Sequence, residues 1–412
     1  MIKVLSPSQV LTMLVMAAFL FCIPASSIAA PAKADDPLKS VKIAASFAYL
    51  GGFSFDPKHP ERRGAAKGIE VVEISPDGKW TSIQTVETFS PGFLAMDSQK
   101  RFLYSSQGDG FEVGAYAIDA TTGKLTLLNK KESSGRNGTH LAVSPDDRFV
   151  VVANYADGTV DSFAINQDGS LGERVSSPST QGDLGPLKAQ SKSMPHHAGF
   201  SKDGRFVLIS DKGRDTVHVF TLDKATGKLA PHTPAGMTSR RNGLGTRRFD
   251  WHPTQPFAYI LEESADSITV ASWDEKKGVL KPIQWVPSVS DTTFHEGDIN
   301  PILRNGSSEL YVAKSGKFLY ATNRSDTSLN GIGSIGCWAI DQKTGRLTPN
   351  GWFSIGAELP RHFNFDPSYK VIFVANQWSG TITALTINEQ TGELSLVGTV
   401  YNTGSPSCIL FK

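Results

Sequence analysis

The sequence is poor in cysteine and has no excess of charge of either sign. Its 412 residues include 3 cysteines, 41 lysines and arginines, and 40 aspartates and glutamates, for a formal net charge of +1. So few cysteines exclude a disulfide-stapled scaffold, and we expect Cys337 and Cys408 to be buried apolar positions in strands. The balanced charge favours neither a nucleic acid partner nor a membrane surface.

The common motifs of metal and covalent chemistry are also missing. The sequence contains no HExxH-like zinc pattern, no Asp-rich calcium loop, no Gly-x-Ser-x-Gly nucleophile motif and no Gly-x-x-x-x-Gly-Lys phosphate loop. We therefore expect no metal and no cofactor. The chemistry that remains is based on acids, bases and charge.

The only long apolar run lies at the N-terminus. Lys3 precedes an apolar stretch over residues 10–23, and small residues follow at 27–30. This order is typical of a cleaved signal peptide, and the apolar stretch is short for a membrane span. We predict a signal peptide over residues 1–30, a short linker over 31–42, and a mature protein that is periplasmic or secreted and free of the membrane.

The rest of the chain repeats a unit of roughly fifty residues. Residues 149–171 and 206–229 show it best, because each reads as strand, tight turn, strand, Gly-containing turn and strand. Repeats of this length and strand content are typical of a β-propeller. Six complete repeats have first strands that we expect to begin near Pro91, Thr139, His196, Arg247, Ser308 and Arg361.

A seventh repeat is split between the two ends of this region. Residues 43–52 and 68–74 resemble second and third strands with no first strand before them, and residues 407–411 form a lone strand. If that strand pairs with the first blade, two exposed sheet edges are removed. We predict an all-β fold over residues 43–412, a seven-bladed propeller closed by a C-terminal strand that joins the first blade. Residues 53–67, 180–195 and 286–306 exceed ordinary turns and are predicted rim loops.

The repeat brings distant residues into one register. In a propeller the start of each first strand lies beside the end of the antiparallel second strand, so residues at these two positions gather around one mouth of the axial channel. Constant offsets from the first residue of each second strand reach a charged set in blades four to seven: His196, Lys212, Arg247, Glu263, Arg324 and Arg361. This pattern predicts a cationic pocket with one carboxylate. The alternative is that these charges are solvated or pair between blades, as Glu263 could with Arg324.

Three neighbouring residues fall outside this register. His197 and Arg248 follow His196 and Arg247 directly, so in a regular strand they should face the opposite way and serve the structure. His140 lies one residue from the register and is a candidate for a supporting contact behind the pocket.

The motifs around these positions resemble the propeller lactonase family, which includes propeller-type 6-phosphogluconolactonases and fungal carboxymuconate-cyclising enzymes. The matching segments fall in order over residues 43–412: Ala153-Asn154-Tyr155, Pro195-His196, Asp211-Lys212-Gly213, Gly245-Thr246-Arg247, Asn323-Arg324 and Pro360-Arg361. The resemblance implies active residues at His196, Arg247, Glu263 and Arg324, with Arg361 as a further recurrent arginine. Met194, Thr246 and Gln107 depart from the family's usual His, Pro and Glu, and these departures bear on the substrate.

The resemblance implies hydrolysis of an anionic sugar-acid lactone, a step of carbohydrate metabolism. We expect the protein to be a monomer. Glu263 would act as general base on water, while His196 and Arg247 stabilise the oxyanion. Arg324, Arg361 and Lys212 would hold the anionic part of the substrate. Burial and neighbouring arginines move the pKa of Glu263 in opposite directions, so the sequence leaves its net shift open. Two alternatives stay open as well: a carboxymuconate-type cyclase or isomerase, and a non-catalytic propeller that binds a ligand or a protein.

Overall fold

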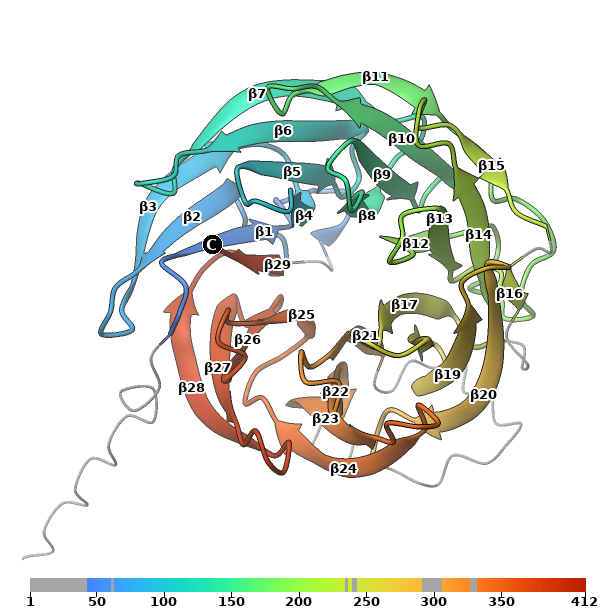
Figure 1. The fold of residues 1–412 in the computed structure, drawn as a ribbon. Helices are drawn as coiled ribbons and strands as arrows, with labels where there is room; N and C mark the ends of the chain where they lie inside the picture. The colour runs from blue at the N-terminus through green and yellow to red at the C-terminus, as the bar shows by residue number, and fades with distance from the viewer. Residues whose placement is uncertain (1–42, 61–62, 234–235, 239–242, 291–305, 327–331) are drawn as a thin grey trace, which may run out of the picture. The chain divides into compact units, whose positions relative to one another are not determined.

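The computed structural model describes residues 43–412 except 61–62, 234–235, 239–242, 291–305 and 327–331. The described residues form seven antiparallel sheets, which are arranged as blades around a central axis (Figure 1). None of them belongs to a helix long and apolar enough to cross a membrane. The predicted signal peptide and linker, and most of the predicted loop at 286–306, lie outside the described residues.

Each blade runs from a first strand at the axis to a fourth strand at the rim. Blade 1 contains β29 (Pro406–Phe411), β1 (Phe47–Gly52), β2 (Gly68–Ile74) and β3 (Trp80–Glu87). Blade 2 contains β4 (Pro91–Met96), β5 (Phe102–Gln107), β6 (Glu112–Ile118) and β7 (Leu125–Glu132). Blade 3 contains β8 (Gly138–Val143), β9 (Phe149–Asn154), β10 (Thr159–Ile165) and β11 (Leu171–Ser176). Blade 4 contains β12 (Pro195–Phe200), β13 (Phe206–Asp211), β14 (Thr216–Leu222) and β15 (Leu229–Pro231), with β16 (Met237–Thr238) also paired to β14.

The last three blades follow the same order. Blade 5 contains β17 (Thr246–Trp251), β18 (Phe257–Glu262), β19 (Ser267–Asp274) and β20 (Val279–Pro287). Blade 6 contains β21 (Ser307–Val312), β22 (Phe318–Asp326), β23 (Ile332–Ile340) and β24 (Leu347–Ser354). Blade 7 contains β25 (Pro360–Phe365), β26 (Val371–Asn376), β27 (Thr381–Ile387) and β28 (Leu394–Asn402). The predicted fold class is confirmed, and five of the six predicted first strands begin one residue earlier than expected.

The C-terminal strand closes the ring. β29 pairs with β1 in antiparallel register, with Ala48 opposite Phe411 and Gly51 opposite Cys408. Blade 1 is thereby built from both ends of the propeller sequence, as the unpaired strand at residues 407–411 predicts. This pairing gives β1 a neighbour on the side that would otherwise be an exposed sheet edge.

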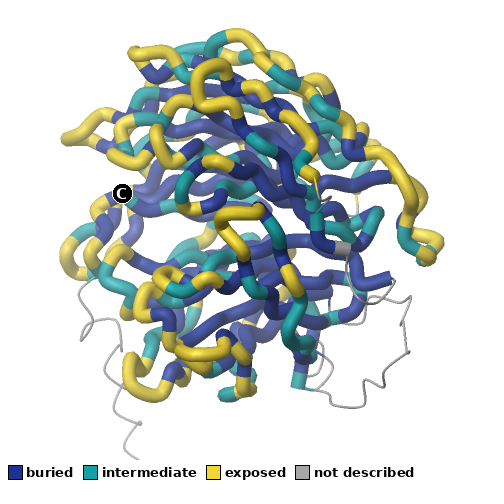
Figure 2. The backbone as a smooth tube through the Cα atoms, turned by 45° about the vertical axis from the view of Figure 1, so that its right-hand side comes forward, coloured by how far each residue is buried: buried dark blue, intermediate teal, exposed yellow. Residues whose placement is uncertain are grey.

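The core lies between neighbouring blades. Seven clusters of buried apolar side chains fill the seven interfaces, from blades 1 and 2 around to blades 7 and 1. Second strands are almost wholly buried, whereas fourth strands are mostly exposed or half-buried after a buried first residue. Figure 2 shows this gradient from the buried axis to the exposed rim. Cys337 and Cys408 are buried in strands and unpaired, as the sequence indicates.

A repeated contact explains the Gly-containing turns that mark the repeat. In six of the seven blades the turn before the fourth strand packs on the phenylalanine that opens the second strand of the preceding blade. Gly123 has a positive φ of 67°, and a Cβ there would lie 2.5 Å from the ring of Phe47. Tyr49, from the same strand as Phe47, donates a hydrogen bond to the Gly123 carbonyl at 2.8 Å. Only glycine satisfies both the backbone and the packing, so the sequence signal marks a joint between blades.

Candidate active site

A β-bulge recurs near the start of each first strand. The pairing of first and second strands shifts register between Pro195 and His197, between Thr246 and Arg248, and at the matching place in the other five blades. Two adjacent residues then oppose one partner residue, which turns both side chains toward the same side. Seven bulges therefore direct fourteen positions toward the axial channel.

This bulge overturns one expectation from the sequence. In a regular strand His197 and Arg248 would face away from His196 and Arg247. Arg247 and Arg248 instead line one small cavity of about 30 Å³ on the axis. The His197 ring lies 4.1 Å from the ring of His140, which comes from the same bulge position of the preceding blade. The strand alternation that we assumed does not hold at a bulge.

The first bulge residues and the ends of the second strands enclose a cavity of about 210 Å³. All six predicted site residues line it: His196, Lys212, Arg247, Glu263, Arg324 and Arg361. Phe53, Asn137, Thr139, Tyr155 and Gln377 complete the lining. Among these described residues four side chains are cationic and one is a carboxylate, a formal surplus of three positive charges. We call this cavity the mouth cavity, and the face on which first strands begin and second strands end the mouth face.

Glu263 lies at the centre of the polar network in the mouth cavity. Its Oε1 accepts hydrogen bonds from Lys212 Nζ at 3.0 Å and from Arg324 Nη1 at 2.7 Å. Its Oε2 accepts a hydrogen bond from Arg247 Nη1 at 2.6 Å. The Glu263 residue is 2% exposed. The pairing with Arg324 that the sequence left as an alternative is therefore present, and two further cations share the same carboxylate.

The cations decide the protonation state of Glu263. Burial raises the pKa of Glu263, but the charges of Arg247, Arg324 and Lys212 outweigh it and hold the pKa well below its ordinary value. Burial lowers the pKa of Lys212, and the neighbouring Glu263 opposes that effect. At neutral pH Glu263 is thus a carboxylate of low basicity.

His196 is held neutral next to this network. Burial lowers the pKa of His196 well below its ordinary value, and the charge of Arg247 lowers it further. Arg247 Nη1 lies 2.5 Å from His196 Nε2, and a guanidinium can only donate. Nε2 is therefore the acceptor, which places the ring proton on Nδ1. The ring of Tyr155 packs edge-on against His196 at 5.7 Å.

Arg247 is fixed by three bonds. Nη1 donates to Glu263 and to His196, and Nε donates to the Ser308 carbonyl at 2.8 Å. Nη2 makes no hydrogen bond to any residue that the structure describes. Arg247 lines both the mouth cavity and the small axial cavity.

Arg361 belongs to a second wall of the mouth cavity. Its guanidinium lies 4.8 Å over the ring of Phe53, and its Nη1 donates to Gln377 Oε1 at 3.3 Å. Tyr155 and Gln377 follow the ends of second strands, and Thr139 and Ser308 lie in the bulges of first strands, so these four residues share the register of the predicted site. Phe53 and Asn137 were missed: Phe53 comes from the predicted rim loop at 53–67, and Asn137 precedes its strand with a φ of 58°. Phe53 occupies no repeat position. Asn137 does, because the residue before the first strand also has a positive φ at Ser90, Leu359 and Ser405, so the period could have found it.

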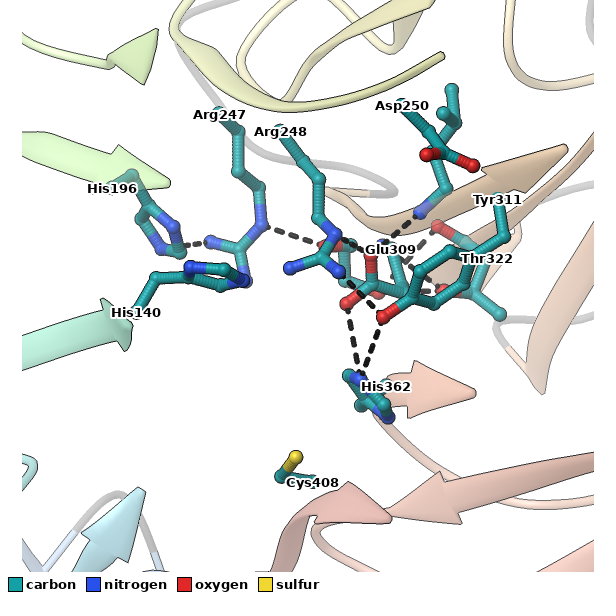
Figure 3. Close-up of polar contacts among 12 residues, drawn as sticks. His140, His196, Arg247, Arg248, Asp250, Glu309, Tyr311, Thr322, His362 and Cys408 are labelled. Carbon is teal, nitrogen blue, oxygen red and sulfur yellow. Dashed lines mark hydrogen bonds and ion pairs between the residues drawn. The ribbon is translucent and has the colours of Figure 1, made fainter. Parts of the chain in front are cut away.

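A second buried network lies deeper on the axis. It is built from the second bulge residues: Phe93, His140, His197, Arg248, Glu309, His362 and Cys408. Figure 3 shows His140, Arg248, Glu309, His362 and Cys408 of this set. Arg248 forms an ion pair with Glu309 and donates to the Tyr311 hydroxyl. Burial raises the pKa of Glu309 to about 7, although Arg248 opposes the shift. We call these seven residues the axial ring.

The two networks are linked through neighbouring bulge residues. In blade 5 Arg247 reaches the Ser308 carbonyl of blade 6, and Arg248 reaches Glu309, the next residue of the same strand. The two arginines thus clamp blade 5 to blade 6 at two adjacent residues. His140, expected as a supporting contact, lies in the axial ring, where its Nδ1 accepts a 3.4 Å bond from the Ala198 amide. No group of three His, Cys, Asp or Glu side chains suited to a metal occurs among the described residues.

Comparisons with known proteins agree with this architecture. The family model "Lactonase, 7-bladed beta-propeller" matches residues 48–411. A 6-phosphogluconolactonase of Bacillus subtilis is 28% identical over 354 residues, which cover 85% of this chain and 95% of that protein. An uncharacterized protein of Lactococcus lactis subsp. cremoris is 30% identical over 365 residues, covering 88% and 98%.

Solved structures of similar fold extend the likeness. A periplasmic gluconolactonase of Pseudomonas aeruginosa has a TM-score of 0.76 at 24% identity, with 89% of this chain and 98% of that chain covered. A protein of Lactobacillus plantarum has a TM-score of 0.76 at 23% identity, covering 89% and 99%. At these identities the structures support the fold alone. The family match over nearly the whole propeller, together with the closed seven-bladed ring, shows that the chain belongs to the seven-bladed β-propeller lactonase family.

Proposed function

We propose that this protein hydrolyses the ester bond of an anionic sugar-acid lactone. The observation that carries the proposal is the buried carboxylate of Glu263, held by three cations in a cavity with a surplus of positive charge. Relatives named 6-phosphogluconolactonase and a fold neighbour named periplasmic gluconolactonase favour a lactone as substrate. The cavity volume of about 210 Å³ suits one small molecule.

Glu263 is the group that activates water. A carboxylate has about four lone-pair positions, and three of them on Glu263 are taken by Lys212, Arg324 and Arg247. The remaining position on Oε2 accepts a hydrogen from the attacking water. As the water oxygen bonds to the lactone carbonyl carbon, its proton passes to Glu263 and the carbonyl becomes an oxyanion.

The low basicity of Glu263 slows this first proton transfer but favours the second. When the tetrahedral intermediate collapses, the bond between the carbonyl carbon and the ring oxygen breaks. The leaving alkoxide then takes the proton from Glu263, and a weakly basic carboxylate releases it readily. The product is a hydroxy acid that ionises, so each turnover releases one proton.

Arg247 stabilises the oxyanion. Its Nη2 makes no hydrogen bond to a described residue and is the donor offered to the substrate, while its other nitrogens are held by Glu263, His196 and the Ser308 carbonyl. A donor fixed before the reaction needs no reorganisation when charge develops. His196 contributes by accepting from Arg247 Nη1, and its neutral state keeps a further positive charge out of the cavity.

Lys212, Arg324 and Arg361 bind the anionic part of the substrate. Lys212 and Arg324 already share Glu263, whereas Arg361 is bonded to Gln377 and stacked on Phe53. Arg361 is therefore the cation on the second wall that would bind a phosphate or carboxylate of the substrate through paired hydrogen bonds. We further propose that the protein acts as a monomer outside the cytoplasm, as its N-terminal sequence pattern favours.

The test is acid release by the mature protein from a panel of γ- and δ-lactones, with spontaneous hydrolysis subtracted. Glucono-δ-lactone and its 6-phosphate belong in the panel, with Arg361→Met run beside Arg346→Met, an exposed arginine in the outer turn of blade 6. Hydrolysis with a preference for the phosphorylated lactone that only Arg361→Met removes is expected. Absence of turnover on every lactone, with cyclisation of a muconate or with tight binding alone, would contradict the proposal.

A further inference from the structure

The exposed aromatic side chains are confined to one sector of the mouth face. Among the described residues four aromatic side chains are exposed: Phe55 at 68%, Phe89 at 42%, Phe111 at 47% and Trp378 at 40%. All four lie in connections that join strand ends on the mouth face. They belong to blades 7, 1 and 2, which are consecutive in the ring (Figure 1).

Four of the five charged residues of the mouth cavity come from the other side of the ring. Lys212, Arg247, Glu263 and Arg324 come from blades 4, 5 and 6, and Arg361 comes from blade 7. One side of the mouth is thus ionic and the other aromatic. Solvent-exposed aromatic surface gathered beside a cavity usually marks a binding site.

The loop at residues 53–67 connects the two sides. Phe53 lines the mouth cavity beneath Arg361, and Phe55 is exposed two residues later. Arg63, from the same loop, lies 4.6 Å over the Trp378 ring of blade 7 and pairs with Glu358 at 3.5 Å. On the other flank Ser54 and Ser90 exchange two hydrogen bonds between the loop and the start of blade 2.

The aromatic rings are interspersed with hydrogen-bonding groups. Arg63 and Glu358 border Trp378, and the Glu358 amide donates to Ser379 Oγ at 2.8 Å. Near Phe111, Asn137 Nδ2 donates to Asp109 at 3.5 Å. An acyl chain needs a continuous apolar groove. A sugar ring instead presents C–H bonds on its faces and hydroxyls at its edge, which matches aromatic faces set among polar side chains.

We propose that the substrate carries a second sugar ring: it is the lactone of a disaccharide or longer aldonic acid. The lactone end enters the mouth cavity at Glu263, and the adjoining sugar ring lies on the aromatic side formed by Phe55, Phe111 and Trp378. This assignment rests on the proposed lactonase function and narrows its substrate class. Trp378 and Phe55 are then residues that determine specificity without touching the reacting ester.

The test compares two lactones that differ by one sugar ring: glucono-δ-lactone and its 4-O-glucosyl derivative. We expect kcat/KM to be about tenfold higher for the disaccharide lactone, equivalent to about 1.4 kcal/mol, mainly through KM. Trp378→Ala should remove most of this preference while glucono-δ-lactone kinetics stay unchanged, and Trp378→Phe should keep part of it. Leu396→Ala is the matched control, because Leu396 is also exposed in blade 7 but lies on its outermost strand.

The outcomes separate this proposal from the lactonase proposal. Hydrolysis of both lactones without a disaccharide preference, or a preference that survives Trp378→Ala and Phe55→Ala, would overturn the sugar assignment alone. A preference for an N-acyl homoserine lactone would overturn it in favour of an acyl tail. If neither of these uncharged lactones is hydrolysed, the anionic lactones of the panel decide the lactonase proposal. Calorimetric binding of the two aldonates then decides the sugar site: at least tenfold tighter binding of the disaccharide aldonate supports it, and equal binding overturns it.

Discussion

The buried ion pair between Arg248 and Glu309 gives a measurable prediction about the axial ring. Both residues are nearly inaccessible, with 7% and 3% of their surface exposed. Replacing Glu309 by Leu leaves Arg248 as a buried charge without its carboxylate, which typically costs roughly 3–5 kcal/mol. Tyr311 and Asp250 still act on Arg248, so we expect a loss near the lower end, about 3 kcal/mol.

The propeller spans residues 43–412, and a chain of that size has an unfolding entropy of about 0.8 kcal/mol/K. A loss of about 3 kcal/mol therefore lowers the melting temperature by about 4 °C. The matching single change Arg248→Met leaves the buried Glu309 without its cation. The pKa of Glu309 already lies near 7, so its carboxylate can take up a proton, and the loss of stability should be smaller. The double variant Arg248→Met/Glu309→Leu removes both charges and should recover most of the loss.

Differential scanning calorimetry at pH 7 on the wild type, the two single variants and the double variant completes the cycle. The reasoning is refuted if both single variants melt within 1 °C of the wild type, or if the double variant loses the sum of the two. Because Arg247 and Arg248 clamp blade 5 to adjacent residues of blade 6, hydrolysis by Glu309→Leu should also fall through kcat, by about tenfold.

Further predictions concern pH and the joints between blades. The raised pKa of Glu309 means that the folded state holds a proton that the unfolded state has lost, so the unfolding free energy of the wild type relative to Glu309→Gln should fall as the pH rises from about 4.5 to about 7. The lowered pKa of Glu263 has the opposite consequence: the Glu263 carboxylate stabilises the folded state above pH 4.5, and this stabilisation is lost only as the pH falls well below that value. Urea unfolding of Glu309→Gln and of Glu263→Gln at a series of pH values would show the two pH ranges. The lowered pKa values of Glu263 and Lys212 predict a pH–rate profile whose acid limb, set by Glu263, lies below pH 4.5 and whose alkaline limb, set by Lys212, lies below pH 10.5. A limb near pH 6.5 would instead implicate a histidine. Gly392→Ala should cost about 2 kcal/mol, because its φ is 77° and the new Cβ would lie 2.5 Å from the Phe318 ring, whereas Gly172→Ala, with its nearest atom at 3.3 Å, should be nearly neutral by urea unfolding.

Much of the architecture follows from the repeat itself. The turn glycines and the aromatic residues that open the second strands fixed the register well enough to place His196, Arg247, Glu263 and Arg324 in one cavity. That inference needs only the period and the antiparallel pairing, because every blade repeats the same backbone. The closing strand follows equally, since residues 407–411 have no other partner within their own repeat.

Other features could not be read from the period. The bulge that turns His197 and Arg248 toward the axis breaks the alternation on which strand arguments depend. Phe53 reaches the cavity from a loop that has no counterpart in the other blades. The pKa of Glu263 is a balance between burial and three charges, so its direction depends on distances of about 3 Å that no sequence pattern supplies.

The most direct test of the account is the rate of lactone hydrolysis by Glu263→Gln, measured on the lactone that the wild type prefers. The amide keeps an acceptor for Arg247 but cannot take the proton from water. We predict a fall in kcat of at least about 100-fold, with the binding of the hydroxy-acid product changed by less than about threefold. Melting curves and Glu263→Asp confirm that the variant is folded and that a carboxylate restores part of the rate. Full activity in Glu263→Gln would contradict the account, because the cavity would then hydrolyse lactones without the carboxylate at its centre.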